Sequence, residues 1–324
     1  MVIKDVADPS PGAHDALIRV KACGICHTDL HIADGLLGEH FPCVLGHEIV
    51  GVIEQVGPEV SNVKPGDRVG VYFFITCGEC KYCLAGEEEA CLTWQTGPRI
   101  CGLTLSGGYA QYATVPAAYC LPLPAELDFV TTAPLFCGGN TVYEGLKRAE
   151  VRPGQRVAVL GIGGLGHLAL QIAKAMGAEV IAITSTESKA DLAKKMGADS
   201  VIVGDGNIGE KLLGIGGADV VLSTTEDSRA VEQVLQGILP KGALALAAFG
   251  TTPISIMPMM LTMGQKRIIG HQFGSRTDMA DLLQLAAKHK IGAVTESFPL
   301  EKANLAHQRL RENQMRLRGV LIPD

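Results

Sequence analysis

Four cysteines stand close together in one polar loop of this 324-residue chain. They are Cys77, Cys80, Cys83 and Cys91, and one lysine and four glutamates lie among them. Zinc takes four thiolates in a closed tetrahedron, and a short loop can wrap around one such ion. The alternative is a set of small buried side chains, which a loop this polar disfavours. We predict a structural zinc ion here, because all four ligand positions would be filled.

A glycine-rich run forms a second motif. It directly follows the apolar segment 157–161 and opens a helical pattern over 165–177. A GxGxxG turn between a strand and a helix lets the backbone approach a pyrophosphate at the helix N-terminus. We predict that this run binds a dinucleotide. Its residues are Gly161, Gly163, Gly164, Leu165 and Gly166.

The residues after the next expected strand, 179–183, bear on which dinucleotide binds. An NAD enzyme usually ends this strand with an acid that binds the ribose 2′-hydroxyl and repels a 2′-phosphate. Here Thr184 and Ser185 stand at that place, with Lys189 shortly after. These side chains favour NADP(H) over NAD(H), although Glu187 counts against a phosphate. The alternative is that they only begin the next helix, with Lys189 in solvent.

The elements that position these motifs fall into two regions. Up to about residue 130 the chain is rich in Gly, Pro and short β-branched runs, at 16–20, 48–56 and 66–74, which predicts a β-rich domain. From residue 150, apolar strands alternate with helical stretches, which predicts an α/β fold with a doubly wound parallel sheet. Those strands are expected at 157–161, 179–183, 200–204, 219–223 and 243–250.

The remaining tail has no strand–helix alternation that we identify. A helix is expected at 278–290 and a last strand at 317–323. We predict that this tail packs back onto an earlier domain.

Composition limits the class of protein. A net charge of -6 argues against nucleic acid as a partner. No apolar run reaches the roughly 18–20 residues of a membrane span, and residues 1–12 lack the apolar core of a secretion signal. We therefore expect a cytoplasmic protein without a membrane partner. All ten cysteines lie in the first half of the chain, which fits metal or thiol chemistry better than disulfides.

Five motifs in order give the chain a family resemblance. They are AxGICHTDLH (22–31), GHE (46–48), the four-cysteine loop, APLFCGGNTVY (133–143) and GIGGLGH (161–167). Over residues 2–323 the sequence resembles the zinc-dependent medium-chain alcohol dehydrogenases, and most of all their bacterial and cinnamyl-alcohol-dehydrogenase-like members. The resemblance implies a GroES-like catalytic domain at 1–134, completed by 273–324, and a Rossmann domain at 135–272. The active site would lie in the cleft between them.

The resemblance also implies a second zinc ion, which is catalytic. Its protein ligands would be Cys26, His47 and Cys137, with water or substrate in the fourth position. Asp29 resembles the carboxylate that orients the imidazole of His47. Glu48 resembles an acid that visits the metal during ligand exchange.

A proton path follows from the same comparison of positions. Thr28 resembles the hydroxyl that takes the alcohol proton and passes it through the cofactor ribose to His31. Histidine exchanges protons readily near neutral pH, which suits release to solvent. His27 occupies the place of a cationic residue that faces the cofactor pyrophosphate. The alternatives are that Asp29 only caps a helix and that His31 is an ordinary surface histidine.

Further cofactor contacts are implied by matching positions. Leu165 resembles a side chain behind the nicotinamide ring, Thr141 one beside it, and Arg276 an arginine on the pyrophosphate. His271 replaces the usual serine after Gly270, so the contact there differs. The run from Thr184 to Lys189 is similar to that of the cinnamyl-alcohol-dehydrogenase branch.

The implied reaction is that of an alcohol dehydrogenase or aldehyde reductase. A hydride would move between a primary alcohol at the zinc (aliphatic, allylic or aromatic) and C4 of the nicotinamide. A polyol dehydrogenase is an alternative, but that branch commonly has an acid at the position of Cys137. A catalytically silent zinc- and NADPH-binding relative is another, but no ligand is missing. Candidate apolar pocket residues, each of which could be core, are Trp94, Leu103, Tyr112, Phe136 and Phe273.

Three further expectations concern assembly and the remaining cysteines. Relatives are dimers or tetramers joined through Rossmann edge strands, so we expect a homodimer or homotetramer, with 219–223 and 243–250 at the edge. Family members usually carry about twenty more N-terminal residues, and whether this start is natural stays open. Cys23, Cys43, Cys101 and Cys120 are given no role.

Overall fold

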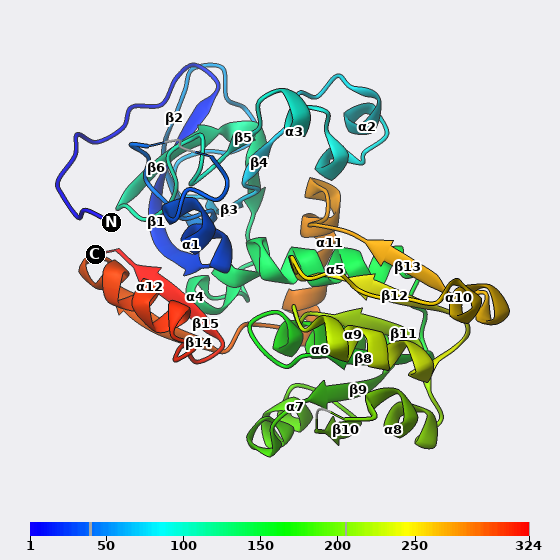
Figure 1. Ribbon diagram of the computed structural model, residues 1–324. Coiled ribbons are helices and arrows are strands. Elements are labelled where there is room, and N and C mark those ends of the chain that lie inside the picture. Colours follow the sequence, from blue (N-terminus) through cyan, green and yellow to red (C-terminus); the bar gives the residue numbers. More distant parts are fainter. Residues whose placement is uncertain (39–40, 205, 324) are drawn as a thin grey trace. The chain divides into compact units, whose positions relative to one another are not determined.

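The computed structural model describes residues 1–38, 41–204 and 206–323 (Figure 1). The chain divides into two compact units. Unit 1 consists of Met1–Cys137 and Gly274–Asp324, and unit 2 consists of Gly138–Phe273. The expected α/β class is confirmed, because unit 1 is built on a mixed β-sheet and unit 2 on a parallel sheet with helices.

Unit 1 contains a seven-stranded sheet in the order β14-β15-β1-β2-β3-β7, with β6 paired to β1. The expected strands at 16–20 and 48–56 lie within β1 and β2, and the run 66–74 divides between β3 and β4. The bounds are β1 Asp15–Ile25, β2 Glu48–Val56, β3 Arg68–Val71, β6 Tyr112–Pro116, β7 Cys120–Pro122, β14 Thr295–Pro299 and β15 Arg318–Ile322. A separate two-stranded sheet joins β4 Phe74–Ile75 to β5 Arg99–Ile100.

The C-terminal tail returns to this sheet, as expected. Strand β15 pairs with β1, and the predicted helix at 278–290 is α11. The prediction that the tail lacks strand–helix alternation was wrong, because β14, α12 and β15 follow one another and the two strands are parallel. Strand β14 was missed because four of its five residues are polar or exposed. The helices of unit 1 are α1 His27–Ala33, α2 Lys81–Leu84, α3 Thr93–Thr96, α4 Phe129–Thr132, α11 Arg276–His289 and α12 Ala303–Arg311.

Unit 2 contains a six-stranded parallel sheet in the order β10-β9-β8-β11-β12-β13. The chain runs outward from β8 to β10 and then returns to the other side of β8, so the direction of winding reverses beside β8. The strands are β8 Arg156–Leu160, β9 Glu179–Thr184, β10 Ser200–Val203, β11 Ala218–Ser223, β12 Ile238–Leu246 and β13 Arg267–Gly270. The helices are α5 Gly138–Arg148, α6 Gly166–Ala175, α7 Ala190–Lys195, α8 Ile208–Gly214, α9 Ser228–Val234 and α10 Pro258–Gly264.

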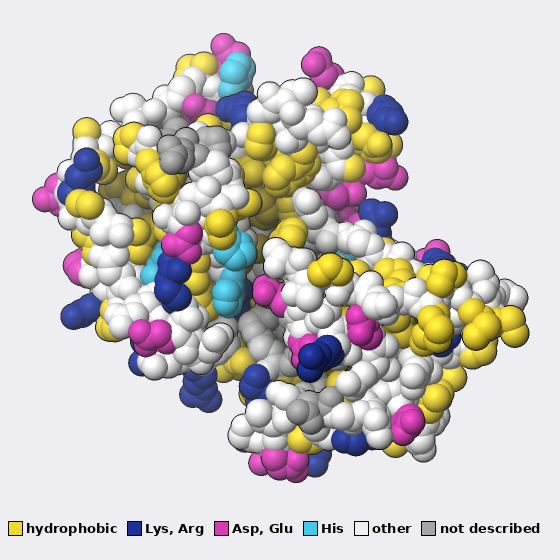
Figure 2. Space-filling view, viewed as in Figure 1, with side chains coloured by type: hydrophobic (Ala, Val, Ile, Leu, Met, Phe, Trp, Pro, Cys, Tyr) yellow, Lys and Arg dark blue, Asp and Glu magenta, His cyan; other side chains and the backbone are white. Residues whose placement is uncertain are grey.

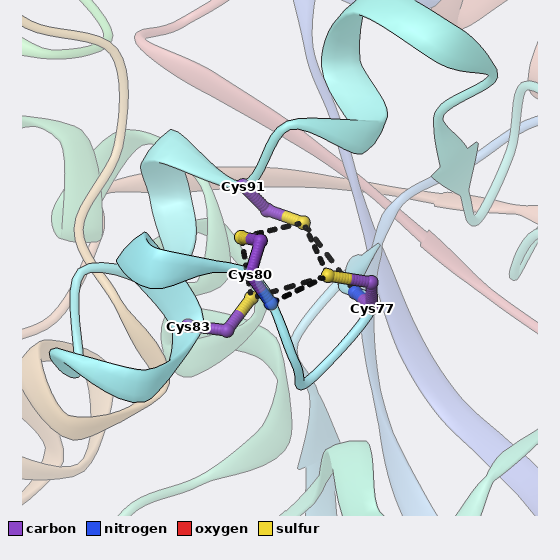
Figure 3. Close-up of side chains that lie close together, drawn as sticks. All are labelled: Cys77, Cys80, Cys83 and Cys91. Atoms are coloured by element: carbon purple, nitrogen blue, oxygen red, sulfur yellow. Dashed lines mark hydrogen bonds between the residues drawn. The ribbon is translucent and has the colours of Figure 1, made fainter.

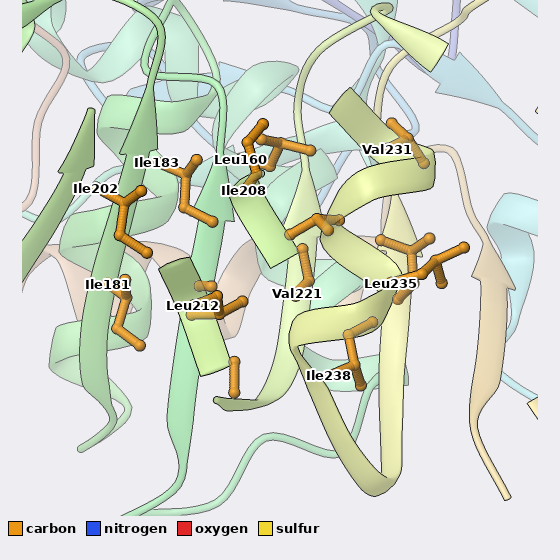
Figure 4. Close-up of a cluster of buried hydrophobic side chains, with 14 residues drawn as sticks. Leu160, Ile181, Ile183, Ile202, Ile208, Leu212, Val221, Val231, Leu235 and Ile238 are labelled. Carbon is orange, nitrogen blue, oxygen red and sulfur yellow. The ribbon is translucent and has the colours of Figure 1, made fainter. Parts of the chain in front are cut away.

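Both faces of the parallel sheet are buried. Ala158 and Leu160 of β8 belong to an apolar cluster with residues of α8 and α9, such as Leu212 and Val231 (Figure 4). Successive strand residues point to opposite faces, and the alternate residue Val159 is also fully buried. A sheet covered on both sides explains why these strands read as continuous apolar runs.

The edges of this sheet differ from those expected. Strands β11 and β12, which contain 219–223 and the first half of 243–250, are interior, and the edges are β10 and β13. Strand β12 also starts earlier than predicted, at Ile238. The prediction began at 243, because Pro240 and Gly242 are residue types that are typical of a turn. They lie instead in an irregularity of the strand, where Lys241 has a φ of 65°.

Hydrophobic side chains are exposed around α10 of unit 2 (Figure 2). Met257, Met259 and Met263 are 61%, 63% and 82% exposed, and Ile268 of β13 is 36% exposed. Within the described ranges, no helix is long and apolar enough to cross a bilayer.

Candidate functional site

The four cysteines of the polar loop point toward one another (Figure 3). The Sγ atoms lie 3.6 Å apart for Cys77 and Cys91, 3.6 Å for Cys80 and Cys83, and 3.9 to 4.0 Å for two further pairs. Ligands about 2.3 Å from a central zinc, at the corners of a tetrahedron, lie about 3.8 Å apart. The four sulfurs therefore fit one zinc ion and leave no open position.

The loop backbone also supports thiolates. The N–H of Cys77 donates to Cys91 Sγ at 3.4 Å, and the N–H of Cys80 donates to Cys77 Sγ at 3.3 Å. Backbone N–H groups of the loop lower the pKa of Cys80 to about 6, whereas burial raises the pKa of Cys83 to about 12. A metal would bind all four as thiolates, because the thiolate is the ligand form.

A second group gathers Cys26, His47, Glu48 and Cys137, whose ligand atoms all lie within 4.8 Å of one another. The sulfurs of Cys26 and Cys137 are 3.9 Å apart, again close to one edge of a zinc tetrahedron. Two sulfurs and one imidazole leave a fourth position open, which is the pattern of a catalytic site. All four residues belong to unit 1.

The strand register of unit 1 explains how distant residues meet here. Gly24 of β1 pairs with Glu48 at the start of β2 and with Val320 of β15. Cys26 directly follows β1 and His47 directly precedes β2, so the antiparallel pair brings them together. A Cβ at Gly24 would lie 1.7 Å from Glu48 Oε2, so only glycine leaves room for this carboxylate.

Asp29 links the helix after Cys26 to His47. Its Oδ2 accepts from the backbone N–H of Cys26 at 2.8 Å and caps α1, and its Oδ1 lies 3.2 Å from Nδ1 of His47. The cap and the imidazole contact, which were alternatives in the sequence, occur together. Because an ionised carboxylate only accepts, Nδ1 carries the proton and Nε2 is the atom left for a metal. Asp29 is fully buried.

Glu48 has a buried partner that the sequence analysis missed. Arg318 of β15 is 3% exposed and donates through Nη2 to Glu48 Oε1. Burial raises the pKa of Glu48, although the nearby Arg318 opposes this. Oε2 is buried without a hydrogen-bond partner among the described residues, which suits a carboxylate that reaches a metal at times. The sequence feature that could have indicated this ion pair is an arginine inside the apolar strand expected at 317–323.

The proposed proton-path residues lie on α1. Thr28 is half-buried, and its Oγ1 lies 3.5 Å from Cys26 Sγ, beside the candidate metal position. His31 is half-buried one helical turn further on, while His27 is exposed. Thr28 and His31 share one side of the helix because residues three apart are neighbours on its surface.

The GxGxxG run follows β8 where the winding reverses. Gly161 has a φ of +92°, which favours glycine. A Cβ at Gly166 would lie 1.9 Å from the carbonyl oxygen of Gly161, whereas one at Gly163 would meet no heavy atom within 4 Å. The loop is thus tight at its ends and open at Gly163, as needed for close approach of a pyrophosphate. Leu165 directly precedes α6.

The residues after β9 offer hydroxyls at its carboxyl end. Thr184 ends the strand and is buried, whereas Ser185, Thr186 and Ser188 are exposed. Lys189 is half-buried. Glu187 is exposed in the same turn.

The other expected cofactor residues have partners of their own. In unit 2, Nε2 of His271 lies 3.1 Å from the carbonyl oxygen of Thr141, and burial lowers the pKa of His271 to about 4. In unit 1, Nε of Arg276 donates to Glu88 at 2.6 Å, and its Nη1 donates to the carbonyl oxygen of Ala118 at 2.8 Å. Part of the Arg276 guanidinium is therefore already engaged.

The candidate pocket residues lie in different surroundings. Phe136 is fully buried, and Leu103 and Phe273 are 5% and 7% exposed, as core side chains are. Trp94 stacks on Phe74 with ring centroids 4.6 Å apart. Tyr112 lies in β6 and is half-buried.

Comparison with known proteins places these features in one family. Residues 12–125 match the family model of the alcohol dehydrogenase GroES-like domain, and residues 164–288 match that of the zinc-binding dehydrogenase. An alcohol dehydrogenase of Geobacillus stearothermophilus is 39% identical over 99% of this chain and 96% of its own length. The aldehyde reductase YahK of Escherichia coli is 34% identical over 98% of this chain and 93% of its own.

Solved structures agree. A cinnamyl alcohol dehydrogenase of Sorghum bicolor has a TM-score of 0.87 at 31% identity and covers 98% of this chain and 92% of its own. The expected GroES-like and Rossmann-type domains are thus confirmed, as is an oxidoreductase that acts on alcohols. This chain belongs to the zinc-dependent medium-chain alcohol dehydrogenase family.

Proposed function

We propose that this alcohol dehydrogenase holds two zinc ions, prefers NADP(H), and interconverts primary alcohols and aldehydes of aliphatic, allylic or aromatic type. The observation that carries the proposal is the convergence of Cys26, His47 and Cys137 with one open ligand position. By its family resemblance, the active form is a homodimer or homotetramer.

The side chains of unit 1 would hold and orient the catalytic metal. Bound zinc supplies a Lewis acid that polarises the substrate oxygen and lowers the pKa of a hydroxyl. Asp29 keeps the proton of His47 on Nδ1, which fixes the ring orientation. Arg318 neutralises Glu48, so that this buried carboxylate adds little net charge beside the two thiolates.

Proton transfer falls to α1. Thr28 lies beside Cys26 Sγ and would accept the proton of the alcohol. His31, one turn further along the half-buried side of the helix, would deliver that proton to solvent. A test is the Thr28→Val variant, which should lose most of kcat while keeping both zinc ions. Thr28→Ser keeps the hydroxyl and should keep most of the activity.

Unit 2 would bind the nicotinamide cofactor, which supplies or accepts the hydride. The open backbone at Gly163 would approach the pyrophosphate, and Leu165 and Thr141 would contact the nicotinamide ring. Arg276 and His27 are proposed for the pyrophosphate as well. The hydroxyls of Thr184 and Ser185, with Lys189, would bind the 2′-phosphate of NADP(H).

The cofactor preference can be tested by charge. Ser185→Asp places a carboxylate at the end of β9, which should weaken NADPH binding about tenfold or more and leave NADH binding equal or tighter. Ser188→Ala, in the same exposed turn, serves as the control. Equal effects of Ser185→Asp on both cofactors would show that the 2′-phosphate binds elsewhere.

Activity and metal content are measured together. Initial rates of aldehyde reduction at 340 nm, with benzaldehyde, cinnamaldehyde and butanal, compare NADPH with NADH before and after chelation. We expect chelator-sensitive turnover, two zinc ions per chain by elemental analysis, and loss of activity in Cys26→Ser. Activity that survives Cys26→Ser would refute the zinc mechanism, and no turnover in fully loaded protein would favour a silent binding protein.

A further inference from the structure

A chain of hydrogen bonds leads from His47 away from the candidate metal position. Asp29 Oδ1 contacts His47 Nδ1 at 3.2 Å, and Asp29 Oδ2 contacts the hydroxyl of Tyr109 at 3.0 Å. The hydroxyl of Tyr109 in turn lies 3.2 Å from Nε2 of His307. His307 belongs to α12 of the C-terminal tail and is 7% exposed. All four residues belong to unit 1.

The direction of each bond follows from the groups present. An ionised carboxylate only accepts, so the single proton of the Tyr109 hydroxyl is donated to Asp29. The Tyr109 oxygen then accepts from Nε2–H of His307. Burial and the charge of Asp29 raise the pKa of Tyr109, and burial lowers the pKa of His307. Near neutral pH both are therefore neutral, as this pattern requires.

Tyr109 also touches the segment that precedes His47. Its backbone N–H donates to the carbonyl oxygen of Leu45 at 2.9 Å, and a Cβ at Gly46 would lie 2.3 Å from Tyr109 Cδ1. The rings of Tyr109 and His307 meet edge to face, with centroids 5.6 Å apart. Tyr109 thus contacts both the main chain that carries His47 and the carboxylate that bonds its imidazole.

We propose that Tyr109 and His307 are positioning residues for His47, which act through Asp29 and thereby slow the loss of the catalytic zinc. The inference rests on the zinc site under the proposed function. Asp29 accepts from three donors: His47, the backbone N–H of Cys26, and Tyr109. Removal of the Tyr109 hydroxyl would leave Asp29 with only two of these donors, so that the carboxylate, and with it the imidazole of His47, is held less firmly.

The main test is Tyr109→Phe in the zinc-loaded enzyme, with transfer of zinc to a chromogenic chelator as the readout. Loss of an outer hydrogen-bond partner of a metal ligand costs about 10–100-fold in metal affinity. Tyr109 is one bond further out, so we expect the lower end, about tenfold. Zinc in the four-cysteine loop should leave at the wild-type rate and is an internal reference. Tyr72→Phe is the matched control, because it removes a hydroxyl that bonds the carbonyl oxygen of Gly274 at 3.0 Å.

A second pair of variants tests the far end of the chain. His307→Leu removes the donor to Tyr109 and should speed zinc loss, whereas His307→Gln keeps an N–H donor and should restore retention. The absorption spectrum of the cobalt(II)-substituted enzyme should shift in Tyr109→Phe and His307→Leu and match wild type in His307→Gln. If Tyr109→Phe does not fold, the His307 pair decides.

The outcomes separate this inference from the function on which it rests. Wild-type zinc retention and an unchanged cobalt spectrum in Tyr109→Phe and His307→Leu would overturn the inference and leave the zinc site intact. Equal zinc loss in His307→Leu and His307→Gln would also overturn it, since the N–H donor would then not matter. If wild type and Cys26→Ser release the same amount of zinc, the zinc site and this inference both fall.

Discussion

A methyl group added at two glycines of the same loop, Gly166 and Gly163, should have different effects, one on stability and the other on cofactor binding. In Gly166→Ala the new Cβ would lie 1.9 Å from the carbonyl oxygen of Gly161, which is about 1.5 Å short of a normal contact. The turn must move, and overpacking of this kind costs about 1–3 kcal/mol. In Gly163→Ala the Cβ meets no heavy atom within 4 Å, and the φ of Gly163 is not positive.

The two variants should therefore separate stability from cofactor binding. We expect Gly166→Ala to lower the free energy of unfolding by about 1–3 kcal/mol. Gly163→Ala should change it by less than about 1 kcal/mol, with a small gain because alanine restricts the unfolded chain. If the pyrophosphate approaches the backbone at Gly163, this methyl group should weaken NADPH binding about tenfold or more, which is about 1.4 kcal/mol.

Urea unfolding and quenching of protein fluorescence by NADPH measure the two quantities on the same samples. Gly206→Ala is a suitable control, since its Cβ also meets no neighbour within 4 Å and it lies outside the glycine-rich run. Wild-type NADPH affinity in a stable Gly163→Ala protein would refute the reasoning. The open space at Gly163 would then have another cause.

Three further results are expected. Arg318→Met leaves Glu48 buried without its cation and should lower the free energy of unfolding, measured in urea, by about 3–5 kcal/mol. The double variant with Glu48→Gln should recover part of this loss, whereas additive losses from the two substitutions would contradict the ion pair. The pKa of His271 is about 4 in the folded chain and ordinarily 6.5, so its contribution to stability is present above pH 6.5 and is lost as the pH falls toward 4. The loss of stability is up to about 3 kcal/mol. His271→Gln should make the melting temperature less dependent on pH between pH 4 and 7, and a pH dependence equal to that of wild type would contradict the assigned pKa. Cys80→Ser should remove about one zinc ion per chain and expose the loop to proteases, whereas full zinc content in this variant would contradict the four-sulfur site.

The sequence alone predicts the parts of the site whose residues lie within one short segment. The four-cysteine loop and the glycine-rich run each lie within a short segment, so their spacing alone indicates their chemistry. Cys137 is 111 residues from Cys26 and was found through the family resemblance. Tyr109 contacts Asp29 across 80 residues, Arg318 contacts Glu48 across 270, and His307 contacts Tyr109 across 198, and no short pattern marks any of them.

Two strand predictions failed for a related reason. Apolar runs identified the buried strands of unit 2, because both faces of that sheet are covered. They did not find Thr295–Pro299, which is mostly polar and is a strand because it pairs with β15. They also placed the start of β12 too late, since Pro240 and Gly242 have the residue types of a turn although the strand continues through them.

The return of the chain to β1 has a chemical consequence as well as a structural one. Asp29 and Glu48 are both fully buried within unit 1, beside two cysteines that we propose as thiolate ligands of a metal. So much negative charge in a buried site needs more than one cation to balance it. The proposed metal would supply one, and Arg318 of the tail supplies another across Gly24, the position where β1 has no side chain in the way. The last strand therefore contributes charge to the site as well as hydrogen bonds to the sheet. In the sequence, this role is indicated by an arginine in an otherwise apolar terminal strand.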